Sequence, residues 1–123
     1  MKPIHTEKAP AALGPYSQAV YKNGLLFISG QLGIDPASGK MPENFIEQAK
    51  LVFSNLRKIL EATDMSFAQV VKTTIFLTDL DNFPELNQLY SQNFGEPFPA
   101  RETVQVSRLP ADGAVEISLI AMK

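Results

Sequence analysis

Two side chains in the last quarter of the sequence, Arg101 and Glu116, have the types that can hold and transform a small anionic substrate. Arg101 lies in the β-favouring run 99–106, and its planar, permanently charged guanidinium matches a carboxylate or a phosphate. Glu116 is the only acid in the apolar run 114–121, where an ionised carboxylate is rarely buried without a partner. A cation that holds the substrate and a carboxylate that handles water or a proton make a minimal hydrolytic site.

Both side chains are expected on β-strands, in which successive side chains point to opposite faces of the sheet. In the Arg101 strand, Val104 and Val106 share one face, which we expect to be the core face, and Arg101 and Thr103 fall on the other. The Glu116 strand has one wholly apolar face, made by Val115, Ile117, Leu119 and Ala121. If these two strands pair antiparallel, Arg101 and Glu116 approach one rim of the sheet.

The composition limits the kinds of chemistry that the chain can perform. A length of 123 residues suits one domain, residues 1–123, with a real core. The absence of cysteine excludes disulfides and thiolate nucleophiles, and the single histidine, His5, excludes a histidine pair or a histidine-rich metal site. We therefore expect no metal.

Charge and hydropathy indicate where the protein works and what it does not bind. The net charge is −2 and no basic run exists, so nucleic acid is not an expected partner. No apolar run approaches the roughly 20 residues that span a bilayer. The first residues also lack the apolar segment of a signal peptide. We expect a cytoplasmic protein without membrane contacts.

The hydrophobic periodicity predicts an α+β fold with the order β-β-β-α-β-α-β-β. The dipeptide Asn23-Gly24 is typical of a type I′ hairpin turn, and Gly30 and Gly33 allow another backbone or a ligand to approach closely. Two helices on one face of a mixed sheet leave the other face to be covered by oligomerisation. The expected strands are 2–8, 16–21, 25–33, 69–77, 99–106 and 114–121, and the expected helices are 43–63 and 84–94.

Four short motifs occur in register along the chain and together closely resemble the RidA/YjgF family of enamine/imine deaminases. The resemblance covers essentially the whole sequence. It implies a chorismate-mutase-like fold that assembles as a homotrimer, with active sites in clefts between subunits. The motifs are Gly14-Pro15-Tyr16-Ser17-Gln18-Ala19, Ile28-Ser29-Gly30-Gln31, Pro99-Ala100-Arg101 with Leu109-Pro110, and Val115-Glu116-Ile117.

The resemblance also implies an activity and a set of site residues. Family members hydrolyse reactive 2-aminoacrylate, 2-iminopropanoate and 2-iminobutanoate to 2-keto acids and ammonia, and they need no cofactor. The family pattern assigns the substrate carboxylate to Arg101 and the reacting water to Glu116. Thr103 stands where other members carry a small residue or cysteine, a departure that bears on substrate preference. The remaining pocket residues implied are Tyr16, Ser29, Gly30 and Asn87.

Other interpretations of the same residues lead to different functions. A non-catalytic trimer that binds small carboxylates such as keto acids would use the same Arg101. A ribonuclease or translation inhibitor, an activity reported for some relatives, is disfavoured by the acidic charge and the single histidine. Taken alone, Arg101 is a solvated strand-end residue, Glu116 an ion-pair partner of Arg101 or a lysine, and Asn87 a surface or capping residue.

Overall fold

The computed structural model describes residues 1–123, and its strands and helices follow the order that the sequence predicts. Short 3₁₀ helices at Phe67–Gln69, Leu80–Asn82 and Pro110–Asp112 were not predicted. Neither α-helix combines the length and the apolar composition that crossing a membrane requires. The main elements are β1 (Lys2–Ile4), β2 (Ala19–Lys22), β3 (Leu25–Gln31), α1 (Phe45–Glu61), β4 (Val70–Leu77), α2 (Phe83–Asn93), β5 (Ala100–Gln105) and β6 (Val115–Met122).

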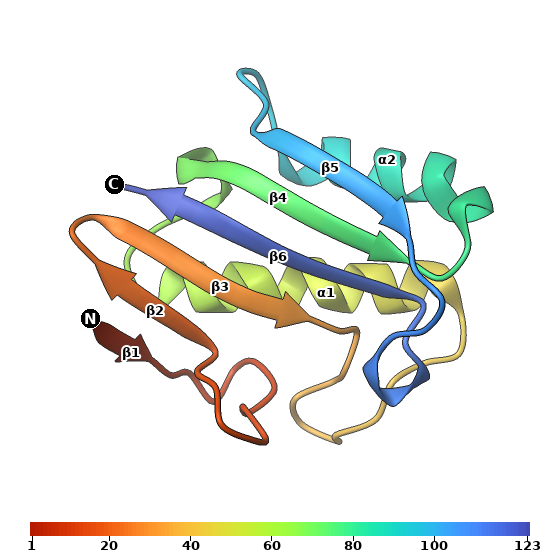
Figure 1. The fold of residues 1–123 in the computed structure, drawn as a ribbon, viewed down its shortest axis with the longest axis horizontal. Coiled ribbons are helices and arrows are strands. Elements are labelled where there is room, and N and C mark those ends of the chain that lie inside the picture. Colours follow the sequence, from red (N-terminus) through yellow and green to blue (C-terminus); the bar gives the residue numbers. More distant parts are fainter.

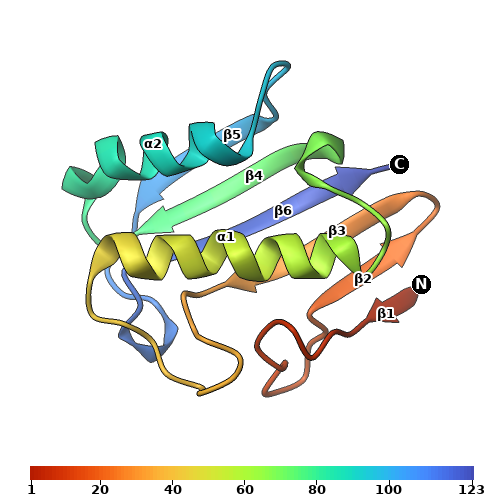
Figure 2. The ribbon, with the colours of Figure 1, turned by 180° about the vertical axis from the view of Figure 1, so that it is seen from behind.

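The strands form one mixed, six-stranded sheet in the order β1-β2-β3-β6-β4-β5 (Figure 1). Every neighbouring pair is antiparallel except β4 and β5, which are parallel and are connected through α2. Both α-helices lie on the same face of the sheet (Figure 2). The α+β architecture with two helices on one face is therefore confirmed.

The strand that carries Arg101 does not pair with the strand that carries Glu116, so the predicted antiparallel pair is wrong. Strand β4 lies between them and pairs with β5 on one side and β6 on the other. A β-α-β crossover joins parallel strands, and α2 accordingly places β5 beside β4 at the edge of the sheet. Strand β6 then occupies the interior of the sheet, between β3 and β4.

The register with β4 decides which face of β5 points toward the helices. Arg101 pairs with Thr73, and Thr103 pairs with Ile75; both β4 partners are completely buried. Residues directly opposite each other in a ladder share a face, so Arg101 and Thr103 point toward α2. Val104 is 43% exposed on the helix-free face. The predicted core face of β5 is therefore wrong, because the apolar content of a single edge strand does not determine its orientation.

The hydrophobic core lies between the helices and one face of the sheet. Strand β6 alternates as predicted, with its apolar face fully packed. Strand β3 is buried on one face only: Phe27 is 41% exposed while Leu26 and Ile28 are buried. Phe27 is exposed because no third helix covers this face of the sheet. The exposed large apolar side chains on the strands of the helix-free face include Phe27, Val71, Val104 and Met122.

Helix α1 docks tightly on the segment that follows β3. A Cβ atom added to Gly33 would lie 2.4 Å from the backbone oxygen of Gln48, which confirms the predicted close approach of another backbone. The Asn55 side chain donates to the carbonyl oxygens of Leu32 and Ile34 at 3.1 and 3.0 Å. These contacts fix the end of β3, where Gly30 lies, relative to the helix.

We expect Gly33→Ala to destabilise the protein by about 1–3 kcal/mol, because the added methyl group meets the α1 backbone, which cannot rotate away. Gly95→Ala is the matched control, since no atom lies within 4 Å of its Cβ position. Denaturant unfolding of both variants measures the difference. Equal stabilities would show that the helix does not pack this closely.

Candidate functional site

The Arg101 side chain lies against one face of α2. One of its terminal nitrogens donates to Asn87 Oδ1 at 2.8 Å, and Cζ lies 4.7 Å from the ring centroid of Tyr90 and 5.3 Å from that of Phe83. The three α2 residues are spaced four and three positions apart, which places them on one side of the helix. We call these four residues the arginine cluster. Beside it is a hollow of about 390 Å³, lined by Asn87, Tyr90, Ser91, Phe98, Pro99 and Arg101.

Tyr90 connects the arginine cluster to the core of the sheet. Its hydroxyl lies 3.0 Å from Oγ1 of Thr73, which is completely buried. Burial raises the pKa of the Tyr90 phenol above its ordinary value of 10.0, although the Thr73 hydrogen bond and the charge of Arg101 both lower it. The phenol is therefore neutral at physiological pH, and its ring faces the Arg101 guanidinium.

Thr103 lies two residues beyond Arg101 on the same face of β5. Its hydroxyl oxygen is buried and has no hydrogen-bond partner. A buried, unsatisfied hydroxyl typically costs about 1–3 kcal/mol. This oxygen is shielded from solvent within the chain. The predicted contact of Thr103 with substrate is not visible in the structure and stays a prediction.

The Glu116 carboxyl group lies on the helix-free face, directly over Gly30. A Cβ atom at Gly30 would be 2.6 Å from Cδ of Glu116, so a larger residue at this position would force the carboxyl group to move. Glu116 forms no ion pair with Arg101 or a lysine, so the alternative in which it serves only as an ion-pair partner is wrong. Burial without a compensating partner raises the pKa of the Glu116 carboxyl group above its ordinary value of 4.5.

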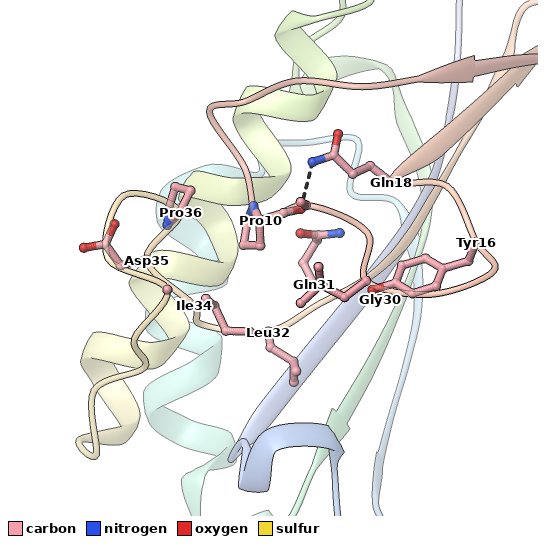
Figure 3. Close-up of a pocket in the computed structure, with 12 residues that line it drawn as sticks. Pro10, Tyr16, Gln18, Gly30, Gln31, Leu32, Ile34, Asp35 and Pro36 are labelled. Atoms are coloured by element: carbon pink, nitrogen blue, oxygen red, sulfur yellow. Dashed lines mark hydrogen bonds between the residues drawn. The ribbon is translucent and has the colours of Figure 1, made fainter.

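Tyr16 and Ser29 lie on the same side as Gly30. Tyr16 is 56% exposed and lines, with Gly30, a hollow of about 240 Å³ (Figure 3). The Ser29 hydroxyl donates to the carbonyl oxygen of Ser17 at 2.6 Å, which ties the loop that carries Tyr16 to β3. We call Tyr16, Ser29, Gly30 and Glu116 the glutamate cluster.

Some residues that shape the two clusters were missed from the sequence. Gln18 is 2% exposed and holds the loop before β2: its Nε2 donates to the Pro10 carbonyl at 2.8 Å (Figure 3), and its Oε1 accepts from the Thr6 backbone at 2.7 Å. Tyr90 and Phe83 were not singled out as site residues. The signal that could have found both is their helical spacing around Asn87.

The arginine and glutamate clusters do not meet within one chain. Arg101 points to the helix side and Glu116 to the helix-free side, with β4 between their strands. Across the sheet, Arg101 is level with Leu119, three residues from Glu116. Standard strand spacing and rise put their Cα atoms roughly 14 Å apart. The prediction that they approach one rim is therefore wrong for a single chain.

Known proteins match this chain over nearly its whole length. The family model described as Endoribonuclease L-PSP matches residues 6–123. A 2-iminobutanoate/2-iminopropanoate deaminase of Capra hircus is 49% identical over 121 residues, covering 98% of this chain and 88% of that protein. The structure of RidA from the Antarctic bacterium Psychrobacter sp. covers 100% of both chains with 47% identity and a TM-score of 0.97. That of E. coli TdcF with bound serine is 40% identical, with a TM-score of 0.95, and covers 100% of this chain and 99% of that one.

We expect Glu116→Gln to be more stable than the wild type at neutral pH but not at acid pH. The folded protein binds the Glu116 proton more tightly than the unfolded chain, because burial raises its pKa. The stabilisation that the protonated Glu116 carboxyl group contributes is therefore complete below pH 4.5, its ordinary pKa. It is lost as the pH rises through the pKa of Glu116 in the folded protein. Unfolding both proteins at about pH 4 and about pH 8 measures the change. A stability difference that is independent of pH would contradict it.

Proposed function

The chain belongs to the RidA/YjgF family, described as Endoribonuclease L-PSP, and from this membership we propose that it is a hydrolytic deaminase. Its substrates are reactive enamines and imines of small 2-amino acids: 2-aminoacrylate, 2-iminopropanoate and 2-iminobutanoate. The products are 2-keto acids and ammonia. The names of relatives such as the Capra hircus deaminase support the reaction class.

The observation that carries the proposal is the Arg101 guanidinium at the edge of an open hollow. A guanidinium has five N–H donors, and the only side chain that accepts from Arg101 is Asn87. The remaining donors can form the bidentate pair that a carboxylate accepts. Each proposed substrate carries a carboxylate next to the reacting carbon, and the bound serine of TdcF carries one as well.

The proposed reaction needs little activation, because an imine carbon is already electrophilic. Arg101 holds the carboxylate, and Glu116 takes a proton from the water whose oxygen adds to the imine carbon. Glu116 then returns this proton to the nitrogen, which gives a tetrahedral intermediate with one hydroxyl and one amino group. In a second transfer Glu116 carries the hydroxyl proton to the amino nitrogen, the C–N bond breaks to release ammonia, and the carbonyl forms. The raised pKa of Glu116 suits it to both proton transfers. Tyr16 borders the hollow next to Gly30, and Ser29 holds the loop that carries Tyr16.

We propose that one site combines the arginine cluster of one copy with the glutamate cluster of another. Their separation within a single chain supports this assembly, because one small substrate cannot span both faces of the sheet. A homotrimer is the closed assembly that we propose. It would also cover the exposed side chains on the helix-free face, among them Phe27, Val104 and Met122.

Two alternatives use the same chain differently. A non-catalytic carboxylate-binding trimer would bind keto acid through Arg101 without needing Glu116. A Glu116→Gln variant that still binds pyruvate but loses turnover separates catalysis from binding, whereas unchanged turnover removes Glu116 from the mechanism. The ribonuclease alternative is disfavoured by the charge balance, since acidic residues outnumber basic ones, 13 to 11.

Arg101→Ala is expected to lower kcat/KM for imine hydrolysis by about 30-fold to several thousand-fold, because one partner of a desolvated charge pair is lost. An amino-acid oxidase generates the imino acid in the assay, and semicarbazide traps whatever the enzyme leaves. Arg108→Ala is the matched control, since Arg108 is exposed and bonds only Asp112. Near-normal turnover in Arg101→Ala would refute the assignment.

A further inference from the structure

The surroundings of Arg101 fix a side chain that is usually flexible. We propose that Phe83 and Tyr90 form an aromatic clamp which, together with Asn87, holds the Arg101 guanidinium in the orientation that binds the substrate carboxylate. Tyr90 is then a positioning residue, because it acts through Arg101. This inference rests on the proposed function only in taking the ligand of Arg101 to be a carboxylate.

The clamp holds the guanidinium without using the groups that bind substrate. Aromatic rings attract a cation through their faces, and the Arg101 Cζ atom lies 4.7 Å from the Tyr90 centroid and 5.3 Å from the Phe83 centroid. The N–H donors lie in the guanidinium plane, and Asn87 accepts from one terminal nitrogen. The clamp therefore consumes few donors and leaves the others for a ligand.

Tyr90 can act as the fixed side of the clamp because its own ring is anchored at two further points. Its hydroxyl is bonded to Thr73, the β4 residue that pairs with Arg101. Its ring stacks on Phe94 with centroids 4.4 Å apart and an interplanar angle of 27°. Tyr90 is 5% exposed, and its packed ring cannot follow a moving arginine. A preorganised guanidinium loses less conformational freedom when it binds a ligand.

The arrangement also explains why the cation is an arginine. A guanidinium is flat, weakly hydrated and able to stack, whereas an ammonium group is a compact point charge with strong hydration. Arg101→Lys keeps the charge but loses the stacked contacts and the two-pronged donor geometry. The clamp therefore favours a flat, delocalised cation at this position and, through it, a planar anionic ligand such as a carboxylate.

The test compares Tyr90→Leu, which removes the ring, with Tyr90→Phe, which keeps the ring but removes the hydroxyl. Phe67→Leu is the matched control, because Phe67 lies under a different arginine, Arg57, at 5.8 Å. Calorimetry measures the Kd for pyruvate. The nitrogen-15 NMR spectrum of the arginine side chains reports on Arg101 directly, since the chain has only three arginines. Arg101→Lys identifies the signal.

Loss of the ring is expected to raise the Kd for pyruvate about 2- to 30-fold and to raise KM with kcat largely retained. The Arg101 N–H signal should move toward the position of an arginine without a ring. Tyr90→Phe is expected to unfold more easily than the wild type, because the Thr73 hydroxyl loses its partner, yet to keep its Kd and its Arg101 signal. If Tyr90 had only a structural role, Tyr90→Leu would lower the stability without changing the Kd or the Arg101 signal. Phe67→Leu should move the Arg57 signal only.

A folded Tyr90→Leu variant with the wild-type Kd and an unmoved Arg101 signal would overturn the clamp. If Tyr90→Leu does not fold, Phe83→Leu takes its place, since Phe83 is only half-buried. A wild-type Kd and an unmoved Arg101 signal in Phe83→Leu would then overturn the clamp. Absence of pyruvate binding by the wild type would also overturn it. A wild type that binds pyruvate without hydrolysing imines would refute the proposed reaction, and the Kd and NMR comparison would still decide the clamp.

Discussion

The alternation of side chains across a single sheet is the constraint on which the rest of the structure depends. Helices cover only one face, so every residue of β4, β5 and β6 points either into the core or toward the open face. Arg101 pairs with the buried Thr73 of β4, so its side chain lies on the helix face and contacts α2. Glu116 pairs with Phe76 of β4 and lies on the open face. The two charged groups are separated by the same alternation that builds the core.

The charged groups of the two clusters also differ in how many partners they have. Arg101 is a hydrogen-bonded and stacked cation, held by three side chains of one helix. Glu116 is an unpaired acid over a glycine, and burial raises its pKa. An oriented cation suits ligand binding, and a carboxyl group that exchanges its proton readily suits proton transfer. Neither cluster alone contains both functions.

The sequence predicted much of the fold, because element order and helix faces depend on local periodicity and turn chemistry. The Asn23-Gly24 turn has positive φ at both residues, as a type I′ turn requires, and the close approach at Gly33 is real. Strand pairing was not predictable in this way, since the place of β5 depends on the crossover through α2. The faces of β5 and the roles of Phe83 and Tyr90 depend on that placement. Candidate residues could be named from motifs, but their division between two faces required the structure.

The most direct test of the proposed site mixes two inactive variants in one assembly. Arg101→Ala keeps Glu116 and Glu116→Gln keeps Arg101, so a site between two copies is intact wherever suitable neighbours meet. Co-expressed in equal amounts, the pair is expected to recover about a quarter of wild-type imine hydrolysis, because each site draws its two residues independently from two copies of a closed ring. No recovery above the separately prepared variants, in assemblies shown to be mixed, would contradict an intersubunit site.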